Sequence, residues 1–403
     1  MNEGIPQAKA DIVRRVEAVL ADADARAELR SHSYVLAEQR VLYVSTPRAA
    51  CTTMKMLLLG ALGLDLSALA ASTIARTSPE TLIHDRERFP TPSLADLDVS
   101  ERSRALTEAG WLRFCVVRNP YARLYSAWED KLLLGDPARP GRFGAPGAYD
   151  VVDEAGGLDV RRSFAAFVSD LARRPSYLLS DAHFRPQHAV VWAADLPYDE
   201  VVRLEQLPAF VSRLRAHVVA QGGCDPGDPP QRNSGLGVDW RRVYDETTAA
   251  RARELYADDF ERWGYDTWLP LSEDPVSSLP PIAFRLVQRV RTMNEGLAVL
   301  STLASGAEAA TSERDVERAG RLRVERHAEQ LASAHSQLVE RYEQLAAEHA
   351  QLVGRHAQLE GDRVRIAAQL DASDARWRAL EARRSVRLLR RLQRTKRRLR
   401  RTP

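Results

Sequence analysis

The sequence has 403 residues, which is enough for about two domains at roughly 150 residues each. Hydrophobic residues make up 44% of the chain and charged residues 28%, values near the average for soluble globular proteins, so extensive disorder is not expected. The net charge of +3 hides an uneven distribution, because residues 383–401 carry eleven Arg or Lys and no acid. The rest of the chain therefore has a net charge of about −8, which argues against a uniformly basic protein that binds nucleic acid.

The three cysteines, Cys51, Cys115 and Cys224, are widely scattered. Their spacing fits neither a zinc site nor a disulfide framework, which is typical of a protein in a reducing cytosol. The N-terminus lacks the apolar core of a signal peptide. The longest apolar stretch, 56–64, is far shorter than the ~20 residues that span a bilayer. We therefore expect a soluble, cytoplasmic protein.

The first part of the chain alternates between helical and strand patterns. Apolar residues recur at helical spacing over 8–30, and the apolar run 40–45 predicts a buried strand. A helix is expected at 51–62, after which residues 72–104 are rich in loops. Residues 112–117 predict a second strand, and Pro120 is suited to the first turn of a helix that continues to about 134.

The following residues continue this alternation. Helical patterns occupy 160–174 and 204–220, with a strand at 201–204 and an amphipathic helix at about 239–262. The order of strands and helices predicts an α/β fold with a parallel sheet. We assign residues 1–272 to this domain.

Beyond residue 272 the pattern changes. Residues 273–318 have the composition of a linker, and residues 319–382 carry a heptad pattern in which leucine or isoleucine recurs every seven residues, at Leu331, Leu338, Leu345, Leu352, Leu359 and Ile366. This period is typical of a coiled coil, and leucine at these positions permits a parallel dimer. The residues four places further on are largely polar, so the alternative is a single solvated helix with one apolar stripe. A basic tail, 383–403, follows.

The most informative segment joins the strand 41–45 to the helix that begins near residue 51. It supplies two hydroxyl groups and free backbone N–H groups at a helix N-terminus, with a basic residue on either side, an arrangement that binds phosphate or sulfate. The segment lacks the glycines of a Walker A loop. Its candidate anion-binding residues are Arg48, Ala49, Ala50, Cys51, Thr52, Thr53 and Lys55.

A second candidate site follows the strand 112–117. Arg118 leaves the end of this strand, and Ser126 lies two helical turns into the next helix. Together they suit a second phosphate, bound by a guanidinium and a hydroxyl. A metal-dependent NTPase more often carries an Asp at such a strand end, so we expect an anion site without a metal.

The two segments resemble motifs of carbohydrate sulfotransferases of the chondroitin/dermatan type. T-P-R-A-A-C-T-T-M-K is similar to their 5′-phosphosulfate loop, P-K-x-G-C-T-x-x-K, and R-N-P-Y-A-R-L-Y-S-A-W, followed by D-K, is similar to their 3′-phosphate motif. Further similarity lies in H-F-R-P-Q at 183–187 and in L-Y-A-D-D-F at 255–260, so it covers about 40–268. Arg48, Ala50 and Asn119 depart from the family pattern, in which Lys, Gly and Asp stand.

The resemblance implies a P-loop-like sulfotransferase fold and the transfer of a sulfuryl group from 3′-phosphoadenosine 5′-phosphosulfate (PAPS) to a hydroxyl group, usually on a sugar. In such a reaction fixed positive charge stabilises the leaving phosphate, and we assign this role to Lys55 and Arg48. The acceptor hydroxyl needs a base of near-neutral pKa, which favours histidine. His84, between the two motifs, is the first candidate, and His183 is the alternative.

We therefore expect a PAPS-dependent sulfotransferase that acts on a sugar-containing acceptor, needs no metal and self-associates through its coiled coil. A P-loop nucleotide kinase or NTPase is one alternative, and a non-catalytic scaffold built on a degenerate sulfotransferase domain is another. No specific nucleic-acid partner is expected. For the basic tail, contact with an anionic membrane surface on the inner face competes with a solvated tail and with non-specific contact to nucleic acid.

Overall fold

The structure is a computed structural model of the chain. It describes residues 4–69, 83–86, 89–135, 147–174, 176, 180–228, 235–272, 278–310 and 318–399.

A four-stranded sheet lies at the centre of the fold, in the order β1-β2-β3-β4. The strands are β1 (Ser33–Leu36), β2 (Val41–Val44), β3 (Leu112–Val117) and β4 (Glu200–Arg203). Strands β2, β3 and β4 are parallel, so the predicted α/β class with a parallel sheet is confirmed for them. Strand β1, which the sequence pattern did not reveal, pairs antiparallel with β2.

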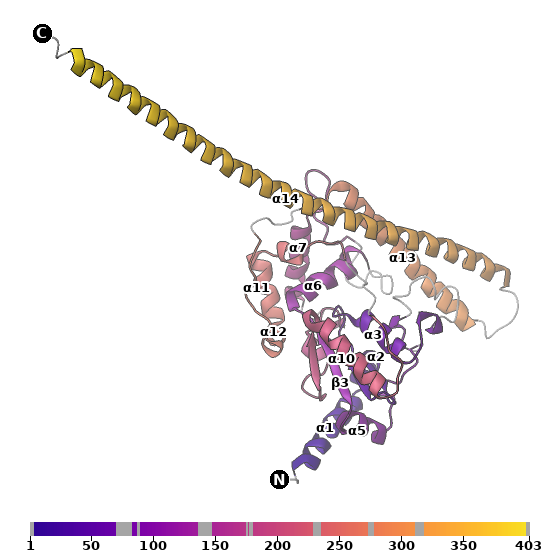
Figure 1. Ribbon diagram of the computed structural model, residues 1–403. Coiled ribbons are helices and arrows are strands. Elements are labelled where there is room, and N and C mark those ends of the chain that lie inside the picture. Colours follow the sequence, from indigo (N-terminus) through magenta and orange to yellow (C-terminus); the bar gives the residue numbers. More distant parts are fainter. Residues whose placement is uncertain are drawn as a thin grey trace. The chain divides into compact units, whose positions relative to one another are not determined.

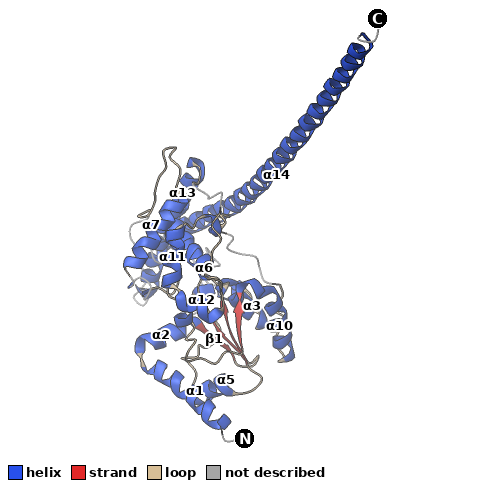
Figure 2. Cartoon of the chain, turned by 90° about the vertical axis from the view of Figure 1, so that its left-hand side faces the viewer, coloured by secondary structure: helices blue, strands red, loops and turns tan. Residues whose placement is uncertain are grey.

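Helices cover both faces of this sheet (Figure 2). Alternate strand residues such as Tyr43 and Phe114 pack against one pair of helices, α3 (Cys51–Ala61) and α10 (Leu207–Ala220). Their neighbours Val44 and Cys115 point to the opposite face and pack against α1 (Gly4–Ala21), α2 (Ala23–His32) and α5 (Val99–Thr107). Because both faces are buried, β2 and β3 are apolar along almost their whole length, as parallel strands usually are.

A second, largely helical core stands beside the sheet (Figure 1). It is rich in aromatic residues, among them Tyr121, Trp128, Phe164 and Tyr244. Its main elements are α6 (Pro120–Trp128), a π-helical turn (Glu129–Leu133), α7 (Val160–Arg173), α11 (Glu246–Leu255) and α12 (Ala257–Trp263). Shorter helical turns are Leu66–Leu69, α9 (Gln187–Val190), Leu204–Gln206 and Trp240–Arg242. Helix α6 starts where β3 ends, so this core is fixed directly to the sheet.

Capping residues set helix boundaries that the hydrophobic pattern alone did not predict. The helix expected over 8–30 is two helices, because Asp22 caps α2 by accepting a hydrogen bond of 2.8 Å from the N–H of Ala25. Asp245 likewise begins α11 within the helix expected at 239–262. In the region expected to be loop-rich, Asp98 and Glu101 form a capping box that starts α5.

The remaining long helices are α13 (Pro281–Ala310) and α14 (Arg318–Leu399). Helix α13 lies within the segment predicted as a linker, and Phe284 and Val287 in its first turns belong to the helical core. The chain divides into compact units at 1–336 and 337–403. Helix α14 contains the whole heptad region, where Leu359 and Ile366 are 67% and 55% exposed. Within the described residues, no helix is long and apolar enough to cross a membrane.

Candidate active site

The loop between β2 and α3 has an unusual backbone. Arg48 and Ala50 both adopt left-handed conformations, with φ values of 67° and 56°, which cost roughly 1–2 kcal/mol each for residues other than glycine. Ala50 is the N-cap of α3 and makes no side-chain capping hydrogen bond. A loop of this kind directs successive N–H groups into a concave anion site at the helix N-terminus. The left-handed conformation of Ala50 explains why glycine, which adopts it without strain, stands at this position in the family pattern.

Lys55, Thr52 and His84 meet at the first turns of α3, where Lys55 and Thr52 are buried and His84 is exposed. Lys55 Nζ lies 2.8 Å from His84 Nδ1, and Thr52 Oγ1 lies 3.1 Å from His84 Nε2. Lys55 is only 4% exposed, and its ammonium stands 5.0 Å from the centre of the Tyr34 ring. Desolvation of the ring by neighbouring protein atoms, together with the charges of Lys55 and Lys131, holds the pKa of His84 well below its usual value, although the residue is exposed at the surface. His84 is therefore neutral at physiological pH.

The two sequence motifs meet in space through Arg48. Its Nε and Nη2 atoms donate to Ser126 Oγ at 3.2 and 2.9 Å. Arg118 at the end of β3 donates from Nη1 to the backbone oxygen of Arg48, at 3.2 Å. Burial and the nearby charge of Arg48 lower the pKa of Arg118 to about 10. Two neighbouring guanidinium groups that raise each other's electrostatic energy form a site that an anion would stabilise.

The backbone of Arg118 is held from two sides. Gln187 accepts from the N–H of Arg118 and donates to its carbonyl oxygen, each at 2.8 Å. The side chain of Asn119 caps α6, accepting from the N–H groups of Tyr121 and Ala122 at 3.0 and 3.3 Å. Asn119 therefore retains the capping function of an aspartate at this position, without its charge.

Two carboxylates next to α6 complete the charge pattern, and sequence reasoning did not identify them as site residues. Asp130 Oδ2 lies 3.0 Å from Arg48 Nη1 and 3.3 Å from Lys131 Nζ. Burial by itself would raise the pKa of Asp130, but these two cations hold it well below its usual value. Burial raises the pKa of Glu129 to about 7. The D-K pair in the second motif was the available signal for Asp130 and Lys131.

Arg123 connects the segment 182–185 to the loop between β2 and α3. The residue is 2% exposed and donates to three backbone oxygens, those of Pro47 at 3.0 Å, Arg185 at 2.8 Å and Ala182 at 2.6 Å. Arg123 thereby holds the segment containing His183 against the β2–α3 loop. His183 Nδ1 lies 2.6 Å from Asp181 Oδ1.

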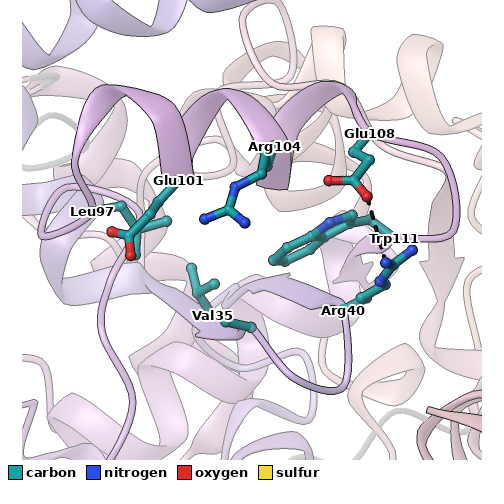
Figure 3. Close-up of a pocket in the computed structure, with 8 residues that line it drawn as sticks. Val35, Arg40, Leu97, Glu101, Arg104, Glu108 and Trp111 are labelled. Atoms are coloured by element: carbon teal, nitrogen blue, oxygen red, sulfur yellow. Dashed lines mark ion pairs between the residues drawn. The ribbon is translucent and has the colours of Figure 1, made fainter.

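No group of three or more His, Cys, Asp or Glu side chains within the described ranges is arranged to hold a metal ion. A separate pocket of about 180 Å³ lies at the opposite end of the sheet, before the starts of β2 and β3 (Figure 3). Trp111 forms one of its walls, and the ion pair between Arg40 and Glu108, 3.5 Å apart, closes one end. The pocket lies away from the carboxyl ends of the parallel strands, where Arg48 and Arg118 lie and where open α/β sheets bind their ligands.

Residues 31–266 match the model of the sulfotransferase family. Carbohydrate sulfotransferase 10 of Gallus gallus is 31% identical over 100 residues, which are 25% of this chain and 25% of that protein. The Danio rerio protein of that name is 31% identical over 107 residues, 27% of each chain. The Homo sapiens protein is 30% identical over 100 residues, 25% of this chain and 26% of the other.

The matched segment thus spans about a quarter of the length of these curated relatives. No solved structure gives a significant match. The family match covers the whole sheet, both candidate anion-binding segments and the helical core up to α12, which is more than half of the 403 residues. On this evidence the chain belongs to the sulfotransferase family.

Proposed function

We propose that the protein transfers a sulfuryl group from PAPS to a hydroxyl group of a carbohydrate. The observation that carries the proposal is the junction of the two motifs at Arg48, which joins the loop before α3 to Ser126 of α6. The family match and the similarity to proteins called carbohydrate sulfotransferase 10 support the same reaction and the same class of acceptor.

The residues present suit the two anionic ends of PAPS. The uncapped N-terminus of α3, with Arg48 and Ala50 in left-handed conformations, suits the phosphosulfate end. Arg118 and Ser126 suit the 3′-phosphate, because an added anion would relieve the repulsion between the guanidinium groups of Arg118 and Arg48. PAPS would supply the sulfuryl group, and the chain would supply orientation, positive charge and a proton acceptor.

Each residue of the site then has a chemical task. The buried ammonium of Lys55 and the guanidinium of Arg48 provide fixed positive charge where negative charge grows on the leaving phosphate, an effect that is strong in a site with little water. Thr52, at the first turn of α3, contributes a hydroxyl. A histidine accepts the proton of the acceptor hydroxyl, and both His84 and His183 lie in this region.

Calorimetry with adenosine 3′,5′-bisphosphate, combined with a labelled-PAPS assay on a panel of carbohydrate acceptors, tests the proposal. Loss of the charged hydrogen bonds in Arg118→Ala should weaken bisphosphate binding roughly 10- to 150-fold. Arg215→Ala is the matched control and should bind normally, because Arg215 of α10 pairs with Asp225 outside the site. Activity should persist in EDTA, whereas the activity of a Mg²⁺-dependent kinase would be lost. A wild-type chain that does not bind the bisphosphate would refute the proposal and favour the scaffold.

We also propose that the chain self-associates through α14. Support comes from the heptad period and from the exposure of Leu345, Leu359, Ile366 and Leu380, which is 42% or more for each. Arg355 and Arg376 occupy heptad positions that face Glu360 and Glu381 of a second copy in a parallel, in-register dimer. Opposite charges at such positions favour this pairing. The partner is therefore a second copy of this chain.

A further inference from the structure

We propose that the proton acceptor of the reaction is His183, positioned by Asp181, and that His84 serves to hold Lys55. This inference rests on the proposed sulfuryl transfer and names the group that receives the proton. As the acceptor oxygen forms its bond to sulfur, the bond from sulfur to the phosphate oxygen breaks and its electron pair stays on the phosphate. The hydroxyl proton passes to His183 Nε2, and the resulting imidazolium releases it to water after the products leave.

The hydrogen bonds of His84 leave it without a lone pair for this task. An ammonium group has three donors and no acceptor, so Lys55 Nζ, 2.8 Å away, must donate to His84 Nδ1. In the neutral ring the proton then lies on Nε2, which donates to Thr52 Oγ1 at 3.1 Å. To accept a proton, His84 would have to release Lys55 and then carry a positive charge beside the ammonium.

His183 has the opposite arrangement. The carboxylate of Asp181, which is 4% exposed, accepts from the backbone N–H of His183 at 2.8 Å and from its Nδ1 at 2.6 Å. A proton fixed on Nδ1 leaves the lone pair on Nε2. Within the part of the chain that the structure describes, Nε2 makes no hydrogen bond, and the side chain is 29% exposed. This is the tautomer that a carboxylate imposes on a histidine base.

The charged groups around His183 come from several elements. Lys131 and Asp130 lie in the turn after α6, Asp181 lies on the same segment, and His84 and His32 are close enough to interact electrostatically with the ring. Burial and the charge of Lys131 lower the pKa of His183, while Asp181 acts in the opposite direction. His183 is therefore neutral near pH 7, and Asp181 is placed to stabilise its imidazolium form.

A second histidine–carboxylate pair in the chain provides the control. His188 Nδ1 lies 2.9 Å from Asp259 Oδ1, but its Nε2 faces a second carboxylate, Asp258, at 3.7 Å. The hydrogen bond that His188 donates to Asp259 raises the pKa of His188, whereas the pKa of His183 is lowered. This pair ties α9 to α12, and substitution of His188 should leave the chemistry unchanged.

Nitrogen NMR of the full chain, labelled with ¹⁵N-histidine, tests the assignment without an acceptor. Signals are assigned with His84→Gln and His183→Gln variants. We expect His183 to carry its proton on Nδ1 and His84 on Nε2, and the Asp181→Asn variant to lower the pKa of His183. The inference is overturned if His183 carries its proton on Nε2 or if the lone pair of His84 Nδ1 is not engaged.

Kinetics with labelled PAPS provide the second arm. His183→Gln should lower kcat by about 10²- to 10⁴-fold, with bisphosphate affinity in calorimetry within about threefold of wild type, whereas His188→Gln should retain both. Asp181→Asn should lower kcat and move the acid limb of its pH profile to lower pH, which a purely structural role would not do. Retained turnover in His183→Gln, with loss in His84→Gln at unchanged affinity, would assign the base to His84. Failure of the wild-type chain to bind the bisphosphate would refute the proposed function instead.

Discussion

Glu129 provides a quantitative test of the electrostatics around the anion site. Its side chain is 6% exposed and accepts from the N–H of Leu236 at 2.9 Å and from the hydroxyl of Tyr125 at 3.3 Å. Both donors can also serve an amide oxygen. Glu129→Gln therefore removes the ionisable proton of the group while its two acceptor contacts persist.

The sign and size of the effect follow from the pKa. Burial is the main cause that raises the pKa of Glu129 from 4.5 to about 7, which corresponds to about 3 kcal/mol in favour of the protonated form. Between these two pH values the unfolded chain releases the proton while the folded chain keeps it. The free energy of unfolding therefore falls as the pH rises through this window, and the full cost of the buried charge is present above it.

Urea denaturation followed by tryptophan fluorescence measures the effect at pH 4.5 and pH 8. Glu129→Gln should raise the free energy of unfolding by about 1–3 kcal/mol at pH 8 and change it little at pH 4.5. Asp130→Asn is the control with the opposite sign, because Arg48 and Lys131 stabilise the charged form of Asp130, so it should be destabilising at pH 8. If Glu129→Gln shifted the stability equally at both pH values, Glu129 would not carry the raised pKa.

Three further predictions concern the backbone, the segment link and the coiled coil. Ala50→Gly relieves the left-handed strain at φ 56° but adds flexibility to the unfolded chain. The free energy of unfolding from thermal denaturation should therefore rise by no more than about 1 kcal/mol. A large fall in that free energy would contradict the strain. Arg123→Met leaves three backbone oxygens without their donor and should lower the unfolding free energy by about 3 kcal/mol in urea; an unchanged value would show that the link is dispensable. Leu359→Lys combined with Ile366→Lys changes two exposed heptad positions of α14. In light scattering this double variant should be a monomer where the wild type is a dimer, while the melting temperature of the sulfotransferase domain stays the same. An unchanged mass would refute pairing through α14.

The sequence predicted the elements that carry the site because their signals are local. The run 112–117 is apolar throughout, and β3 occupies those residues. Pro120 marked the first turn of α6, and the residues before Cys51 marked the start of α3. Parallel neighbours end at the same edge of a sheet, so two motifs that each follow a strand lie close together, as Arg48 and Ser126 do.

The contacts that complete the site depend on residues far apart in the chain, which no local pattern encodes. The partners of Arg123 are separated from it by 59 to 76 positions. The burial of Lys55 depends on Tyr34 of β1, a strand too short to show a period. The raised pKa of Glu129 depends on burial beside the core around Trp128, against which the hydrogen bond from the distant Leu236 acts in the opposite direction. Tertiary packing determines each of these features, and the amino-acid composition does not indicate them.

The placement of charge also bears on how tightly the proposed site would bind an anion. Arg48 is already fixed by Ser126 and Asp130, and its side chain is 15% exposed. Ordering such a side chain costs up to about 2 kcal/mol in conformational entropy. Because Arg48 is already ordered in the folded protein, anion binding would not add this cost. Asp130 neutralises part of the positive charge of Arg48 and Lys131. The binding free energy of an anion would therefore depend on how Asp130 offsets Arg118, Arg48 and Lys131, and not on the number of cations alone. A net charge of +3 for the whole chain therefore says nothing about anion affinity, which would depend on how the cations of the site and Asp130 are held together.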